Sequence, residues 1–240
     1  MSKFVKVFCV LLSLGLGASL YSQEKLQTIE FTVYGQYPIR GDIEYLPVSR
    51  EAINNGARAE DPITLRTHSL TRIGPYQFKG GRTIQFFDTL TKELVGGVNL
   101  PSGSKKWLLI FVKNTRYEED PKNNLKYKIY PFDDSRQNLP KNGLVFLNLS
   151  KMKLSGTVGT QKTNLTPGES DPFRISDRLR IALKTPDLYG QKMLPAHIKD
   201  YRFKQNHRYL MILFPPVLSG SADADVRFLR ESLEQLENKK

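Results

Sequence analysis

Beyond its first residues, the chain contains three short and almost wholly apolar runs. The first is Trp107–Val112, six consecutive apolar residues between Lys106 and Lys113. A run of this length, rich in β-forming residues, predicts a strand buried on both faces, because a buried helix is normally longer. The runs Leu144–Leu149 and Tyr209–Phe214 have the same character. A strand of an ordinary sandwich leaves one face in water, so a further layer must cover these three. The candidates are the N-terminal half of the chain and a helix at its C-terminus.

Alternation of apolar and polar residues predicts half-buried strands along the rest of the chain. In Thr28–Tyr34, the apolar residues Ile29, Phe31 and Val33 occupy every second position, which is the two-residue period of a strand. Shorter strands are predicted by the same reasoning and by flanking turn residues. They are Asp42–Val48, Thr64–Thr67, Tyr76–Lys79, Arg82–Phe87, Leu94–Leu100, Leu125–Tyr130, Leu154–Val158, Gln161–Leu165 and Arg178–Lys184.

A different period closes the chain. Within Asp223–Glu237, the apolar residues Val226, Leu229, Leu233 and Leu236 recur at helical spacing, with Arg and Glu between them. This spacing predicts a short amphipathic helix. Many short strands, abundant turn residues and one terminal helix favour an all-β fold: an antiparallel β-sandwich, built as two β modules, with a short C-terminal amphipathic helix.

The N-terminus has the pattern of a signal peptide. Lys3 and Lys6 precede the uncharged apolar run Val7–Leu20, and Ser19 or Ser22 offers a small residue for cleavage. The alternative is an uncleaved anchor. We expect an exported protein, periplasmic or extracellular, that meets the membrane only through this segment. The single cysteine of the chain lies inside it, so thiol catalysis and cysteine-bound metal are excluded from the mature protein.

Turn residues suggest how the chain divides. Pro101-Ser102-Gly103-Ser104 contains only turn-forming residues and is either a linker or a hairpin loop. No internal sequence repeat is evident. The expected parts are a signal peptide (1–22), an N-terminal β module (23–103), a β-sandwich domain (104–219) and a C-terminal helix and tail (220–240).

Positive charge is concentrated in one stretch. The chain has a formal net charge of +12, and residues 178–208 contain eight Lys and Arg residues against two Asp residues, with aromatic residues between them. Such a surface attracts anionic polysaccharide, another envelope component or a protein. Export argues against nucleic acid. The alternative is a solvated sheet face without a ligand. The predicted binding residues are Arg178, Arg180, Lys184, Arg202, Lys204 and Arg208.

Familiar catalytic patterns are missing. The nucleophile elbow, the phosphate-binding loop and the zinc-protease helix are absent, and the three histidines have no ligand spacing. We therefore predict no cofactor and no metal. Asp133 and Asp134 form an alternative loop site, because adjacent carboxylates can bind calcium or act as acid and base. The simpler interpretation is a turn in which these side chains bond the local backbone.

Two short motifs carry a resemblance. Val145-Phe146-Leu147-Asn148-Leu149-Ser150 and Leu165-Thr166-Pro167-Gly168-Glu169-Ser170 resemble a pattern in uncharacterised families of small exported bacterial β-sandwich proteins, some from Verrucomicrobia-like bacteria. The resemblance implies a sandwich in the cell envelope and no particular reaction.

The sequence favours a non-enzymatic binding or scaffold protein of the periplasm or cell envelope, with a basic surface for an anionic partner. One alternative is a carbohydrate-active hydrolase that uses Asp133 or Asp134. The other is a structural subunit of an envelope complex.

Overall fold

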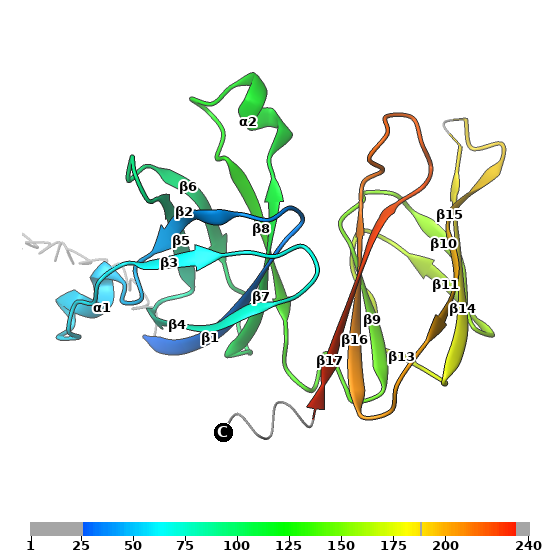
Figure 1. Ribbon diagram of the computed structural model, residues 1–240, viewed down its shortest axis with the longest axis horizontal. Coiled ribbons are helices and arrows are strands. Elements are labelled where there is room, and N and C mark those ends of the chain that lie inside the picture. Colours follow the sequence, from blue (N-terminus) through cyan, green and yellow to red (C-terminus); the bar gives the residue numbers. More distant parts are fainter. Residues whose placement is uncertain (1–25, 188, 234–240) are drawn as a thin grey trace, which may run out of the picture.

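The computed structural model describes residues 26–187 and 189–233, which form an all-β protein (Figure 1). The predicted fold class is confirmed in this respect. The expected signal peptide, residues 1–22, lies outside the described residues. Within the described part of the chain, neither helix is long and apolar enough to cross a membrane.

The first half of the structure contains eight strands and two short helices. They are β1 (Gln27–Gly35), β2 (Arg40–Tyr45), α1 (Arg50–Asn54), β3 (Ile63–Arg66), β4 (Ile73–Gly80), β5 (Thr83–Asp88), β6 (Leu94–Asn99), β7 (Lys106–Lys113), α2 (Thr115–Glu119) and β8 (Tyr127–Asp133). The strands form two sheets, in the orders β4-β1-β7-β8 and β3-β2-β5-β6.

The second half contains nine strands. They are β9 (Gly143–Asn148), β10 (Leu154–Val158), β11 (Gln161–Leu165), β12 (Gly168–Glu169), β13 (Phe173–Arg174), β14 (Arg178–Pro186), β15 (Met193–Arg202), β16 (His207–Phe214) and β17 (Asp225–Ser232). Their sheets have the orders β12-β9-β16-β17, with β13 also pairing with β9, and β11-β10-β14-β15.

The two halves have the same strand topology. In the first, β1 runs parallel to β7, and β4 and β8 flank this pair antiparallel. In the second, β9 runs parallel to β16, flanked by β12 and β17. The opposite sheets also correspond, since β3-β2-β5-β6 matches β11-β10-β14-β15 strand for strand. The chain is therefore a tandem pair of sandwiches with one topology, a repeat that its sequence does not reveal.

Strand pairing divides the chain at a different point from the turn at residues 101–104. β7 follows that turn, yet it pairs with β1 and so belongs to the first sandwich. The turn carries the chain from β6 in one sheet to β7 in the other. The first sandwich ends with β8 at Asp133, and the second begins with β9 at Gly143.

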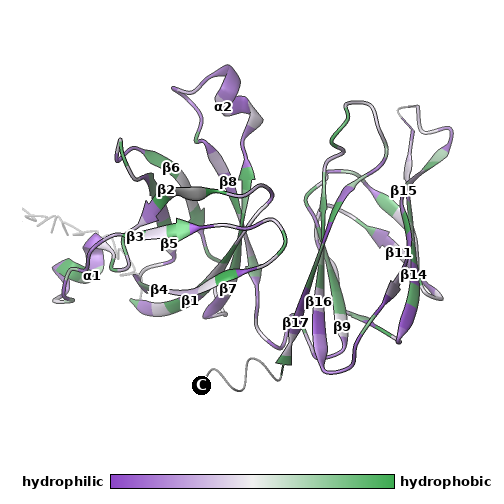
Figure 2. Ribbon diagram, in the orientation of Figure 1, coloured by the Kyte–Doolittle hydropathy of each residue, from purple (hydrophilic) through white to green (hydrophobic). Residues whose placement is uncertain are grey.

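Three apolar cores follow from the alternation of side chains along the strands. Each sandwich has its own core between its two sheets. A third core lies between the sandwiches, where β1, β7 and β8 face β9, β16 and β17. In β7, Trp107, Leu109 and Phe111 enter the first core, whereas Leu108 and Ile110 enter the third. Figure 2 shows the green, hydrophobic residues along β7 and β9.

This third core explains the three apolar runs of the sequence. β9 and β16 also divide their side chains between two cores, so each run needs apolar residues at odd and even positions alike. Of the two coverings considered, packing between the N-terminal and C-terminal halves is the one observed. Four sheets are thus stacked in sequence, as Figure 1 shows from one side of the molecule to the other.

The predicted C-terminal helix is wrong for the residues that the structure describes. Asp225–Ser232 is strand β17, paired antiparallel with β16 over its whole length. Residues 234–237 of the expected helix lie outside the described part. The error arose from polar residues counted as solvent-facing. Arg227 pairs with Asp225 and Glu231 pairs with Arg208, so the strand carries ion-paired charges between its apolar residues.

Candidate functional site

The outermost sheet of the second sandwich exposes cations at alternate positions of β14. Arg178, Arg180 and Lys184 are exposed, whereas Ile181 and Leu183 are fully buried in the core. Because successive side chains of a strand point to opposite faces, burying Ile181 and Leu183 forces the three cations outward. Three of the six predicted binding residues therefore share one surface.

Pairing with β15 adds Arg202 to this surface. Arg202 lies directly opposite Arg178, and directly opposed residues of antiparallel strands share a face. Asp200 lies opposite Arg180, with 3.6 Å between its Oδ2 atom and Nη1 of Arg180. Both side chains of this pair are mostly exposed, at 63% for Arg180 and 75% for Asp200. Water and salt screen such a pair, so it holds the two side chains together only weakly, and Asp200 subtracts one charge from this surface.

Lys162 is a further cation of this face that sequence reasoning missed. It stands opposite Thr157 of β10, and Thr157 stands opposite Ala182 of β14. Ala182 points to the same side as Arg180 and Lys184, so Lys162 does too. Pairing the predicted strands Leu154–Val158 and Gln161–Leu165 as a hairpin, and extending this sheet to the predicted strand Arg178–Lys184, could have found it. We call the exposed set Lys162, Arg178, Arg180, Lys184 and Arg202 the outer basic face.

Lys204 lies beyond the end of the outer basic face, in the connection from β15 to β16. It lines a shallow hollow of about 670 Å³ together with Arg178 and Asp177. Lys204 is exposed, so it can add charge at the edge of the surface, beside the carboxylate of Asp177.

Arg208 does not join the surface for which it was predicted. It lies in β16 with its side chain 5% exposed, between the two sandwiches. Its Nη1 atom donates to the carbonyl oxygen of Asp134 at 2.7 Å, and Nη2 lies 3.1 Å from Asp134 Oδ2. Arg208 also pairs with Glu231. Arg72 completes the cluster, with Nη1 2.7 Å from Asp134 Oδ1 and 3.5 Å from Glu231 Oε2.

The predicted loop carboxylates have structural partners. Asp134 is held by Arg72 and Arg208, as described above. Asp133 accepts a hydrogen bond from the backbone N–H of Ser135 at 2.9 Å, and Ser135 Oγ accepts one from the N–H of Asn138 at 3.3 Å. These contacts are those of a polar turn. They favour the simpler interpretation of the Asp133–Asp134 pair over an acid–base role.

The inner side of β15 carries two titratable groups that stay neutral. His197 Nε2 and the Tyr201 hydroxyl oxygen are 2.8 Å apart. Burial raises the pKa of Tyr201 to about 12, and burial also lowers the pKa of His197 despite the nearby carboxylate of Asp223. At neutral pH the sheet therefore owes its positive charge to Lys and Arg alone, and attraction of an anion should be constant over that range.

The chemistry of this face is that of anion binding. Guanidinium and ammonium groups donate charge-assisted hydrogen bonds to carboxylate, sulfate or phosphate oxygens. Among the residues that the structure describes, no group of three or more His, Asp or Glu side chains is arranged to hold a metal ion. No protein-family model matches the chain, and a search of curated proteins also finds no match.

Proposed function

We propose that this protein is an exported, non-enzymatic binding protein that holds an anionic polymer, such as an acidic polysaccharide of the cell envelope, on its outer basic face. One observation carries the proposal. Five cations from β11, β14 and β15 share a solvent-exposed sheet surface. Among the described residues that the previous section places on this surface, Asp200 is the only one with a carboxylate. The signal-peptide pattern of residues 1–22 supports the proposed location outside the cytoplasm.

The spacing of the charges suits an extended ligand rather than a compact one. Alternate residues of a strand are about 7 Å apart, and neighbouring strands are about 4.8 Å apart. Arg178, Arg180 and Lys184 lie in a row along β14. Arg202 in β15 and Lys162 in β11 place further cations on the strands beside this row. A flat array without a deep pocket can pair with successive acidic groups of a polymer, each contact being weak and their sum substantial.

Chromatography on immobilised heparin tests the proposal. Changing Arg178, Arg180 and Lys184 together to Ser removes three exposed cations, so the salt concentration needed for elution should fall by about half. The matched control changes Lys79, Lys105 and Lys122 to Ser. These residues are also exposed and lie elsewhere, so this control loses the same formal charge and should elute close to the unmodified protein.

If both triple variants elute together, bulk charge and not the outer basic face causes retention, and the proposal is wrong. Unchanged retention after the Arg178, Arg180 and Lys184 substitutions would reject it as well.

A further inference from the structure

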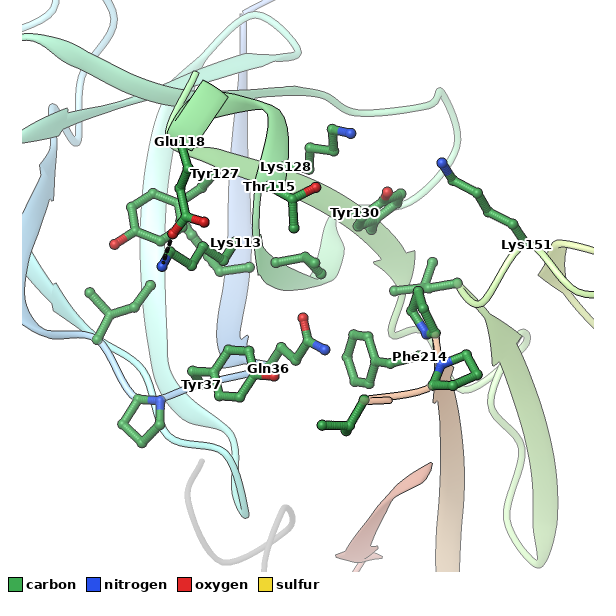
Figure 3. Close-up of a pocket in the computed structure, with 18 residues that line it drawn as sticks. Gln36, Tyr37, Lys113, Thr115, Glu118, Tyr127, Lys128, Tyr130, Lys151 and Phe214 are labelled. Atoms are coloured by element: carbon green, nitrogen blue, oxygen red, sulfur yellow. Dashed lines mark ion pairs between the residues drawn. The ribbon is translucent and has the colours of Figure 1, made fainter. Parts of the chain in front are cut away.

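A cleft of about 720 Å³ opens at one end of the contact between the two sandwiches. It lies where β1, β7, β9 and β16 reach their carboxyl ends, far along the interface from Arg208 at the start of β16. The residues after β1 and β7 form one wall with part of β8, and the residues after β9 and β16 form the other (Figure 3). This volume is within the usual range of small-ligand sites.

The backbone at the base of the cleft is already satisfied. The N–H of Gln36 donates to the carbonyl oxygen of Phe111 at 2.9 Å, and the N–H of Leu149 donates to that of Leu213 at 2.8 Å. An extended peptide that adds a strand needs free main-chain groups along an edge. A ligand here would instead be recognised by side chains.

Two lysines from different sandwiches line the opening. Lys128 comes from β8 and Lys151 follows β9, and their side chains extend toward one another above Tyr130 in Figure 3. Neither forms an ion pair with a carboxylate of the described residues, whereas Lys113 in the same cleft pairs with Glu118 at 2.5 Å. The opening therefore has uncompensated positive charge contributed from both sides.

The backbone of Lys151 adopts an uncommon conformation in the connection between β9 and β10. Its φ angle is +63°, in the left-handed region that non-glycine residues seldom adopt. Holding a lysine there costs on the order of 1 kcal/mol, but Lys92, Asn142 and Asn206 adopt the same conformation in other connections, so the angle alone does not mark a ligand site. The Lys151 side chain extends over the cleft.

Aromatic rings supply the apolar part of the cleft. Tyr37, Tyr130 and Phe214 all line it; Tyr37 is 52% exposed, whereas Phe214 is fully buried and offers no free ring face. Ring faces of this kind stack on flat, apolar C–H surfaces, while the tyrosine hydroxyls remain free to bond polar groups. Pyranose sugars present such C–H faces, and uronic acids add a carboxylate at the ring edge.

We propose that this cleft binds a short acidic oligosaccharide of uronic-acid type. Its carboxylates are held between Lys128 and Lys151, and its sugar rings stack on Tyr37 and Tyr130. The site is separate from the outer basic face, which lies on the outermost sheet of the second sandwich. The cleft contains residues of both sandwiches, so it exists only where the two halves pack together.

Isothermal titration calorimetry with a galacturonic acid trimer tests this inference. The trimer should bind the full-length protein, and its neutral methyl ester should not. Lys128→Gln and Lys151→Gln should each weaken binding about tenfold, and Tyr37→Ala about fivefold. The matched control Lys122→Gln removes an exposed lysine outside the cleft and should leave the affinity unchanged.

Three results would overturn the assignment: no trimer binding at millimolar concentration, equal binding of the methyl ester, or tighter binding of a tri-glutamate peptide. Trimer binding that persists in the Lys128→Gln/Lys151→Gln double variant would also overturn it. The variant in which Arg178, Arg180 and Lys184 are changed to Ser should bind the trimer as the unmodified protein does. The proposal for the cleft and the proposal for the outer basic face can therefore be rejected independently.

Discussion

Arg208 shows how a charged residue can be mistaken for surface when only the sequence is read. Its neighbours in the chain are basic, yet its guanidinium lies between the sandwiches and pairs with Asp134 and Glu231. With Arg208 5% exposed and Asp134 10% exposed, the desolvation cost is high and the partners must stay together. Sequence alone does not show this, because both partners are more than twenty residues from Arg208 along the chain.

Replacing Arg208 should therefore destabilise the protein. Arg208→Met leaves the buried carboxylate of Asp134 and the partly buried carboxylate of Glu231 with only Arg72, and should reduce the free energy of unfolding by about 3–5 kcal/mol. The control Arg180→Met breaks an exposed pair and should cost less than about 1 kcal/mol. Urea denaturation followed by circular dichroism measures both changes. Equal losses in the two variants would show that the buried pairs contribute no more than the exposed one.

At the scale of elements, Gly156 shows how closely β10 approaches β14. Gly156 pairs with Leu183, and a Cβ atom added to it would overlap the carbonyl oxygen of Ala182. A larger residue at position 156 would push β10 and β14 apart. The pairing of these two strands, which carry part of the outer basic face, therefore depends on this glycine. Gly97 in β6 differs, because a Cβ atom added to it would meet no atom closer than the carbonyl oxygen of Ile84, at 3.7 Å.

We expect Gly156→Ala to destabilise the protein by about 1–3 kcal/mol, as overpacked sites do. Gly97→Ala should be neutral or stabilising by up to about 1 kcal/mol, since alanine restricts the unfolded chain more than glycine does. Thermal unfolding monitored by circular dichroism compares the two. If Gly156→Ala leaves the melting temperature unchanged, β10 and β14 are not as close as described.

The sequence predicts most strands because burial imposes a period that can be read directly. β1, β7, β9, β14 and β16 all follow apolar patterns set by one or two cores. β15 was missed because an edge strand with a proline and exposed charges has no such period. β17 was read as a helix because its charged residues are paired within the fold. Both errors concern edge strands that carry charged residues between their apolar ones.

At the scale of the whole molecule, the contact between the sandwiches separates two binding surfaces. Its middle is apolar, one end contains the Arg72–Asp134–Arg208–Glu231 cluster, and the other opens as the cleft. Four of the six predicted binding residues do share the outer basic face, because strand alternation and local charge are visible in sequence. The cleft was not predicted, since Lys128 and Lys151 become neighbours only when the two halves pack.

The salt dependence of anion binding tests most directly whether the outer basic face is the binding surface. The dissociation constant of a heparin octasaccharide, measured at several sodium chloride concentrations, gives a slope that counts the cations engaged. A plot of the logarithm of the dissociation constant against the logarithm of the salt concentration should have a slope of about four for the unmodified protein. Changing Lys162, Arg178, Arg180, Lys184 and Arg202 together to Ser should reduce this slope to below about one. A slope unchanged by these five substitutions would contradict the account.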